Sequence, residues 1–331
     1  MKARTSGPAQ FSAGAGYDEY TIELGPQQKA GPTSQSTPEE ERVNVPKVAA
    51  ARRPQHKPKL GQHFLASDEY ARRIAEAVGD ISQSTVLEIG PGRGIITSLL
   101  AKRARRLIAV ELDRVLAAQL RLKFGMARHV EIIEADILAV DLDSLFGPKP
   151  GLGRPGIEVK PQPVKVVGNL PYYITSDILL RLFAFSKYFE SIVIMVQREV
   201  ADRIAAEPGG REYGMLSATA QLYARVENLF TVPPEAFAPA PKVHSAVLRL
   251  TVAPQQERLG VAGDGFIDFL RLSFGQKRKT LWNNLKAKYA EGDLRSALAE
   301  ARVKATARAE TLSLEQSAAI FRSLRNSPFR S

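Results

Sequence analysis

Four consecutive residues, Asn169-Leu170-Pro171-Tyr172, have the types needed to hold an amine for alkylation. The exocyclic amine of adenine is a poor nucleophile because its lone pair is delocalised into the ring, so it needs acceptors for its two N–H groups. The Asn169 side-chain oxygen and the Leu170 carbonyl can supply them. Pro171 would fix the backbone so that this carbonyl points inward, and Tyr172 can stack on the extruded base. These four residues are the predicted catalytic segment.

Taken alone, the same four residues also fit an ordinary Asn-Pro turn with a packed tyrosine. Their position favours chemistry, because they follow an apolar run, residues 164–168, that is predicted as a buried strand. Doubly wound sheets bind ligands at the carboxyl ends of their strands. A methyl donor that carries its methyl group on a cationic sulfonium is already activated, so in-line positioning would supply most of the acceleration without a strong base. The segment therefore predicts methyl transfer to an adenine amine.

A glycine-rich turn lies at the end of an earlier apolar run, residues 85–89. Gly90, Gly92 and Gly94 form the pattern G-x-G-x-G, and a helical stretch follows. Such a turn lets a ligand approach the backbone, and the start of the following helix favours an anionic group. The dinucleotide fingerprint needs its third glycine where Ile95 stands, which disfavours a nicotinamide cofactor. The turn predicts a nucleotide-like cofactor, although a tight turn without a ligand has the same pattern.

Two acidic residues follow at the ends of the next two predicted strands. Glu111 closes the second strand, where an acid can accept hydrogen bonds from both ribose hydroxyls, and Leu112 beside it can pack on an adenine face. Asp136 closes the third strand and can accept from an adenine amine, with Ile137 next to it in the same predicted site. Each acid alone also fits a solvated strand end. A glycine turn and two acids at three successive strand ends, in this order, are a much stronger indication of a cofactor site.

Apolar runs alternate with helical stretches along the chain. Strands that are apolar throughout must be covered on both sides, so we predict an α/β fold, a Rossmann-like parallel sheet with helices on both faces. Ser67 or Asp68 is expected to cap the first helix, and 218–232 and 243–252 are expected to add further strands. The predicted strands are 85–89, 107–111, 130–134, 164–168 and 191–196, and the predicted helices are 68–78, 94–104, 113–124, 176–187 and 198–206.

Composition divides the chain into three regions. Residues 1–56 are rich in Gly, Pro, Ser, Gln and Ala, which predicts a disordered N-terminal extension. Residues 57–252 are assigned to the methyltransferase domain, with a surface loop at 147–163 that is dense in Pro and Gly. Helical patterns dominate the remainder, so 253–331 is predicted to be a small C-terminal helical domain.

The bulk composition limits the classes of function. Of the 331 residues 44% are hydrophobic, and the net charge of +11 favours a polyanionic partner such as nucleic acid. The absence of cysteine excludes disulfides and thiol catalysis, and the four histidines show no metal-ligand spacing. No apolar run is long enough to span a membrane, and the N-terminal residues lack the apolar stretch of a secretory signal, so secretion is not expected. We therefore expect a cytoplasmic protein without a metal or a membrane partner.

Taken in order, the motifs resemble those of the ribosomal RNA adenine dimethyltransferases, specifically the small-subunit enzymes that dimethylate two adjacent adenosines near the 3′ end. The resemblance runs from about Lys57 to about Arg325. The family often has Asn where His63 stands, and the N-terminal extension and the 147–163 insert depart from the compact family pattern. The matching motifs are Leu60–Leu65, Glu88–Gly92, Val110–Asp113, Glu134–Asp136, Gly168–Tyr172, Met195–Glu199, Phe237–Val243 and Arg308–Leu312.

The resemblance implies S-adenosylmethionine as the cofactor. Glu111 would then hold the ribose and Asp136 the adenine, while Gly90 would approach the methionine portion. Phe237 would stack on the target base opposite Tyr172, although without the family it fits an anchor for a Pro-rich turn. The cofactor contacts predicted in this way are His63, Leu65, Gly90, Gly92, Glu111, Leu112, Asp136, Ile137 and Asn169.

A basic segment, Gln276–Thr280, is predicted to lie on a helix of the C-terminal region, with Arg271 nearby. Its Lys277, Arg278 and Lys279 suit contacts with phosphates. A charge run is also common on a solvated helix face, but the resemblance places this segment in the domain that faces rRNA. Recognition would then depend mostly on RNA shape and on an extruded base.

The sequence thus predicts an S-adenosylmethionine-dependent rRNA (adenine-N6,N6)-dimethyltransferase. It would act, as a monomer, on small-subunit rRNA or a pre-ribosomal small subunit, with a role in ribosome assembly. Two alternatives stay open: a large-subunit rRNA adenine N6-methyltransferase of the resistance type, and a non-catalytic RNA-binding assembly or transcription factor on the same fold. The helical C-terminal pattern favours the small-subunit dimethyltransferase over the large-subunit enzyme.

Overall fold

The computed structural model describes residues 63–147, 164–171, 173–262 and 265–325. The extension predicted to be disordered, most of the 147–163 loop and the predicted catalytic residue Tyr172 lie outside the described residues. No helix within those ranges is long and apolar enough to cross a membrane.

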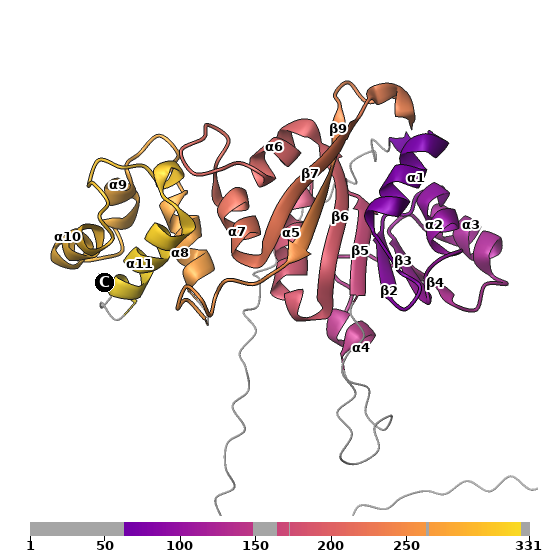
Figure 1. Cartoon of the computed structure of the whole chain (residues 1–331), viewed down its shortest axis with the longest axis horizontal. Coiled ribbons are helices and arrows are strands. Elements are labelled where there is room, and N and C mark those ends of the chain that lie inside the picture. Colours follow the sequence, from indigo (N-terminus) through magenta and orange to yellow (C-terminus); the bar gives the residue numbers. More distant parts are fainter. Residues whose placement is uncertain (1–62, 148–163, 172, 263–264, 326–331) are drawn as a thin grey trace, which may run out of the picture. The chain divides into compact units, whose positions relative to one another are not determined.

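A seven-stranded sheet forms the centre of the fold (Figure 1). Its strands are β2 (Thr85–Ile89), β3 (Arg106–Glu111), β4 (Val130–Glu134), β5 (Val164–Asn169), β6 (Phe189–Gln197), β7 (Ala224–Val232) and β9 (Ser245–Val252). The order is β4-β3-β2-β5-β6-β9-β7, with β4 to β6 parallel and β9 antiparallel to both of its neighbours. The chain runs outward from β2 to β4 and then returns to place β5 on the other side of β2. Such a reversal opens a crevice at the carboxyl ends of the two strands, where ligands bind.

Helices cover both faces of this sheet (Figure 1). Alternate strand residues enter two separate cores, because successive side chains of a strand point to opposite faces. Val86 and Leu107 pack with α1 and α2, whereas Leu87 and Ile108 pack with α5. The predicted α/β class is therefore confirmed, and all five strands predicted up to residue 196 are present. The helices of this part are α1 (Asp68–Ala77), α2 (Ile95–Leu100), α3 (Arg114–Phe124), α4 (Leu142–Phe146), α5 (Thr175–Ala184), α6 (Arg198–Ile204) and α7 (Met215–Tyr223).

The prediction of a strand from residue 218 onward was wrong, because α7 continues to Tyr223 and β7 begins only at Ala224. This helix is buried on nearly all sides: Leu216 packs on the sheet core, while Leu222 packs on the core of the C-terminal helices. A helix that is covered all round has no polar face. The 3.6-residue period that identifies a helix in a sequence is therefore missing here.

Within the described residues, the C-terminal region contains α8 (Phe266–Ser273), α9 (Leu281–Leu285), α10 (Glu291–Glu300) and α11 (Leu314–Leu324). These helices enclose a core in which Phe269, Leu285 and Ile320 are buried. The same core takes in Tyr213, from the segment that precedes α7. Side chains from both sides of residue 253 thus share one core, and the domain boundary at that point stays a prediction.

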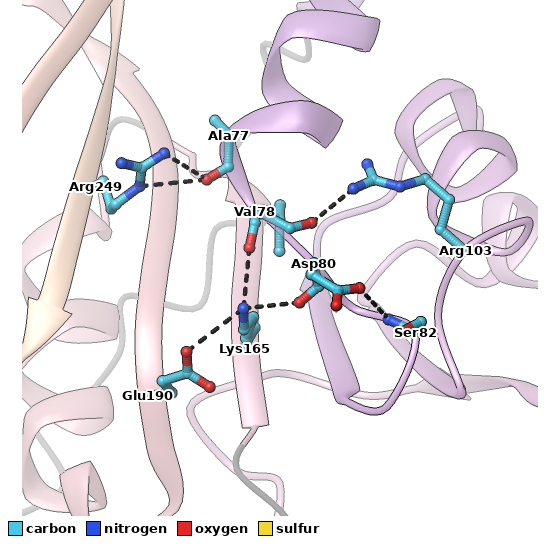
Figure 2. Close-up of polar contacts among 9 residues, drawn as sticks. Ala77, Val78, Asp80, Ser82, Arg103, Lys165, Glu190 and Arg249 are labelled. Atoms are coloured by element: carbon cyan, nitrogen blue, oxygen red, sulfur yellow. Dashed lines mark hydrogen bonds and ion pairs between the residues drawn. The ribbon is translucent and has the colours of Figure 1, made fainter.

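Three cations from separate elements hold the end of α1 (Figure 2). Arg249 of β9, Lys165 of β5 and Arg103 donate hydrogen bonds to carbonyl oxygens within residues 75–80. The last carbonyls of a helix lack partners within it and carry its partial negative charge, so cations stabilise this end. They fix α1 and, with it, the short strand β1 (Phe64–Leu65) just before it. The closest contacts are 2.6 Å from Arg103 to Gly79, 2.8 Å from Lys165 to Asp80 and 3.0 Å from Arg249 to Ala77.

Candidate cofactor and substrate site

A cavity lies where β2, β3, β4 and β5 end, around the reversal of strand order. It is lined by every residue that the sequence predicted to contact the cofactor, and also by Leu170 and Pro171 of the predicted catalytic segment. The fold thus gathers residues from four separate strand ends and from the segment before α1. Their shared cavity is observed, whereas their individual contacts with a cofactor stay predictions. The nine are His63, Leu65, Gly90, Gly92, Glu111, Leu112, Asp136, Ile137 and Asn169.

The turn after β2 requires glycine for two reasons. Gly90, Gly92 and Gly94 have φ angles of 67°, 57° and 75°, in the left-handed region that other residues rarely adopt. A Cβ atom on Gly94 would also lie 2.6 Å from the Leu120 Cδ2 atom of α3. Without side chains, the turn packs closely against the protein and leaves its backbone open to the cavity.

Glu111, at the end of β3, is tied to the glycine turn. Its Oε2 accepts the N–H of Gly92 at 3.0 Å, and its Oε1 accepts the N–H of Asp113 at 2.9 Å. The residue is only 5% exposed, so its carboxylate is held rigidly. Each carboxylate oxygen has a further lone pair, which suits the predicted acceptance of hydrogen bonds from ribose hydroxyls.

Asn169 is the last residue of β5. Its Nδ2 donates to the His63 carbonyl at 3.4 Å, an orientation that keeps the Oδ1 atom as the acceptor for other groups. The N–H of Leu170 donates to the Met195 carbonyl of β6 at 3.1 Å, and its side chain is buried. The backbone that carries the predicted amine acceptor is therefore anchored to the sheet.

A two-stranded pairing holds the cavity residues that precede α1. Strand β1 pairs antiparallel with β8 (Phe237–Ala238), with Leu65 opposite Phe237. The Nδ1 atom of His63 lies 2.8 Å from the Pro239 carbonyl oxygen. Phe237 itself is 4% exposed, belongs to the core under α1, and does not line the cavity. Its stacking on a target base stays a prediction, but its pairing with Leu65 positions the cavity wall.

Glu88 is a cavity residue to which the sequence analysis assigned no role. It lies in β2, is only 2% exposed and lines the cavity. Its Oε2 atom has no hydrogen-bond partner among the described residues. Burial raises the pKa of this carboxyl from 4.5 to about 7, and the charge of Glu111 adds to the rise. The sequence did contain a signal that could have identified Glu88, because it is a charged residue inside an otherwise apolar strand.

The basic segment predicted to contact RNA lies away from this cavity, in the C-terminal region. Residues 276–280 form a turn between α8 and α9, so the prediction of a helix there was wrong. The Nδ2 atom of Asn284 donates to the carbonyls of Ser273 and Gln276, at 2.6 and 3.3 Å. Thr280 caps the next helix by accepting the Asn283 N–H at 3.3 Å. These side-chain contacts end one helix and begin another, which charge pattern alone does not reveal.

The predicted RNA-binding side chains are all exposed. Lys277 donates from Nζ to the Arg211 carbonyl at 2.8 Å, and Arg271 forms an ion pair with Asp268. Arg278 and Lys279 make no ion pair or hydrogen bond through their side chains among the described residues. Across all the residues that the structure describes, no group of three or more His, Asp or Glu side chains could hold a metal ion.

Comparison with known proteins gives the family. The model of the ribosomal RNA adenine dimethylase family matches residues 53–326. This chain belongs to that family. A ribosomal RNA small subunit methyltransferase A from Koribacter versatilis is 56% identical over 283 residues, which cover 85% of this chain and 99% of that protein. The Acidobacterium capsulatum protein of the same name is 54% identical over 270 residues, 81% of this chain and 91% of its own.

Two solved structures have the same fold as this chain. A dimethyladenosine transferase from Plasmodium falciparum has a TM-score of 0.63 at 22% identity, over 80% of this chain and 98% of its own. The 23S rRNA methyltransferase ErmE has a TM-score of 0.58 at 27% identity, over 80% of this chain and 100% of its own. The family, the fold and the enzyme class predicted from the sequence are confirmed, with S-adenosylmethionine as the cofactor.

Proposed function

We propose that this chain transfers methyl groups from S-adenosylmethionine to N6 of two adjacent adenosines near the 3′ end of small-subunit rRNA, during assembly of the subunit. The observation that carries the proposal is the one cavity shared by Glu111, Asp136 and Asn169 at three strand ends. The relatives named for the small subunit are 54% and 56% identical to this chain. The 23S rRNA methyltransferase is 27% identical, so the large-subunit alternative is not favoured.

The groups that line the cavity are of the kinds needed to bind S-adenosylmethionine. The glycine turn leaves room for a ligand at the backbone, and Glu111 has lone pairs for two hydroxyls. The unpartnered Glu88 Oε2 is a buried acceptor suited to a cationic group. When bound, the cofactor supplies a methyl group that its sulfonium already activates. The residues of this chain then need to bind and orient, and no strong base is required.

The catalytic segment holds the target amine in this proposal. The Asn169 Oδ1 atom and the Leu170 carbonyl accept its two N–H groups and draw its lone pair out of the ring. The anchoring of Leu170 to β6 keeps this geometry rigid, which is what orientation effects need. Tyr172 and Phe237 are proposed to stack on the extruded base. Every predicted cofactor residue is present in the cavity, which argues against a non-catalytic RNA-binding factor.

The remaining parts of the proposal concern the RNA and the surroundings. Arg271, Lys277, Arg278 and Lys279 are proposed to contact rRNA phosphates from the C-terminal domain, residues 253–331. The enzyme is proposed to act as a monomer in the cytoplasm. Two observations support these parts of the proposal, namely the exposure of the basic side chains and the family resemblance.

The test is mass spectrometry of rRNA after incubation with the protein and S-adenosylmethionine. Small-subunit rRNA should gain dimethyladenosine at two adjacent positions, and large-subunit rRNA none. Asn169→Ala should reduce the methylation rate by roughly 100-fold or more, since loss of one oriented polar group at the reacting centre has that scale, while RNA binding stays nearly intact. Asn228→Ala, an exposed change on β7, is the matched control. Methylation confined to large-subunit rRNA, or full activity of Asn169→Ala, would refute the proposal.

A further inference from the structure

A second cavity lies at the opposite edge of the sheet from the cofactor cavity. Seven residues at the starts of β2, β3 and β4 line it, and we name it the arginine pocket. Strand β2 has five residues, and a strand rises about 3.3 Å per residue, so the two cavities are separated by roughly 16 Å. No single nucleotide can occupy both. The lining residues are Gln83, Thr85, Arg105, Arg106, Arg128, His129 and Glu131.

The arginine pocket carries excess positive charge. Among the described lining residues, Glu131 is the one acid, and it is already paired with Arg106, at 2.8 Å. Arg105 and Arg128 are exposed, and neither guanidinium has an ion pair or hydrogen bond to any other described residue. Lys102, close by in the chain, is exposed as well. Like charges held together in this way repel one another, and an anion between them relieves the repulsion.

The backbone beneath these side chains is fixed. The N–H of Arg105 donates to the Ile81 carbonyl at 3.2 Å, and the N–H of Leu107 donates to the His129 carbonyl at 2.8 Å. The His129 Nε2 atom lies 2.7 Å from the Ala101 carbonyl oxygen. Arg105 directly precedes β3, and Arg128 lies in the turn before β4, which the N–H of Val130 closes by donating to the Ala127 carbonyl at 2.9 Å. Both guanidinium groups thus extend from short segments tied to the sheet, which lowers the entropic cost of binding a ligand.

The chemistry of the lining selects phosphates. Guanidinium groups bind phosphate through two parallel N–H donors. Gln83 and Thr85 add neutral polar groups that can bond to a phosphate or a ribose hydroxyl. The part of the chain that the structure describes places no Phe, Tyr or Trp in the lining on which a base could stack. The pocket is thus suited to the backbone of a folded RNA, without reading its bases.

We propose that the arginine pocket is a second rRNA contact, which binds backbone phosphates of the substrate at the far edge of the sheet from the target adenosine. The inference rests on the proposed function, because it takes the substrate to be a large folded rRNA. Contacts at both edges of the sheet explain how a protein without base readout at this site can select a subunit-sized RNA by its shape.

The test is the salt dependence of binding to full-length small-subunit rRNA. Each lost phosphate contact lowers the slope of log K against log salt by roughly 0.7 to 0.9. The double variant Arg105→Gln/Arg128→Gln should therefore lose about 1.5 from the slope and bind at least tenfold more weakly at 0.1 M salt. Arg225→Gln, at an exposed arginine on β7 whose side chain has no ion pair or hydrogen bond to any other described residue, removes one positive charge, so twice its effect is the reference for the double variant. The affinity for S-adenosylmethionine should be unchanged, because the pocket lies outside the cofactor cavity.

Methylation kinetics separate this inference from the proposed function. The double variant should raise the KM for rRNA and leave kcat near that of the unmodified protein, since the reacting groups are untouched. If the changes in slope, log affinity and log KM of the double variant are no more than twice those of Arg225→Gln while the unmodified protein still forms dimethyladenosine, the pocket is no rRNA contact. If the unmodified protein forms no dimethyladenosine on any rRNA, the proposed function fails and this inference with it.

Discussion

Glu88 gives the sharpest test of the cavity's electrostatics. Its carboxyl has a pKa of about 7 in the folded protein and an ordinary value of 4.5, with burial as the main cause. The folded state therefore binds more protons than the unfolded state between pH 4.5 and 7. Stability from this group is fully present below pH 4.5 and is lost as the pH rises through 7. The pKa gap corresponds to about 3 kcal/mol at pH values above 7.

The substitution Glu88→Gln keeps the shape and removes the titration. The free energy of unfolding of the variant, relative to the unmodified protein, should rise by roughly 2–3 kcal/mol between pH 5 and pH 8.5. For a chain of this size 1 kcal/mol shifts the melting temperature by about 2–4 °C, so the gap between the two melting curves should widen by several degrees. Thermal unfolding without cofactor measures it. Glu257→Gln, which removes an exposed carboxylate, is the control.

The reasoning fails if the melting temperatures of Glu88→Gln and the unmodified protein run parallel from pH 5 to 8.5. A second readout comes from cofactor binding, because the proposed site would bring the positive charge of S-adenosylmethionine to a cavity that Glu88 shares with Glu111, Asp136, His63 and Arg93. A cation favours the ionised carboxylate. Calorimetry at pH 7 in buffers of different ionisation enthalpy should show about half a proton released on binding, and none with Glu88→Gln. Equal proton release from both proteins would remove Glu88 from the cofactor's surroundings.

Three further predictions concern other parts of the molecule. Glu111→Ala should weaken S-adenosylmethionine binding at least tenfold by calorimetry, because hydrogen bonds to a charged group contribute about 1.5–3 kcal/mol; unchanged affinity would exclude it from the site. Lys165→Met should lower the free energy of unfolding by about 2–4 kcal/mol in thermal melts, since it leaves carbonyls at the end of α1 unpaired; an unaltered melting temperature would contradict the anchoring of α1. Reversing the charges of Lys277, Arg278 and Lys279 should flatten the salt dependence of rRNA binding, and an unaltered slope would show that they do not contact RNA.

The sequence by itself determined the cofactor edge of the sheet. Apolar runs end at Gly90, Glu111, Asp136 and Asn169 in that order, and parallel strands bring their carboxyl ends to one edge whatever the details of packing. The glycine turn was also predictable, because a positive φ selects glycine directly. Chain order and residue type therefore sufficed to predict that these residues meet in one cavity, and the ordered motifs sufficed for the family.

Only the tertiary structure decided four other features. It showed that α7 is a helix, because burial between two cores erases the pattern that marks one. It showed that residues 276–280 form a connection rather than a helix. The side chain of Asn284, which belongs to a separate element, holds this connection by hydrogen bonds. It placed Glu88 in the cavity with a raised pKa, and it joined Arg105 to Arg128 in one pocket. Burial, pKa and pocket formation depend on neighbours that are distant in the chain, and local spacing does not encode them.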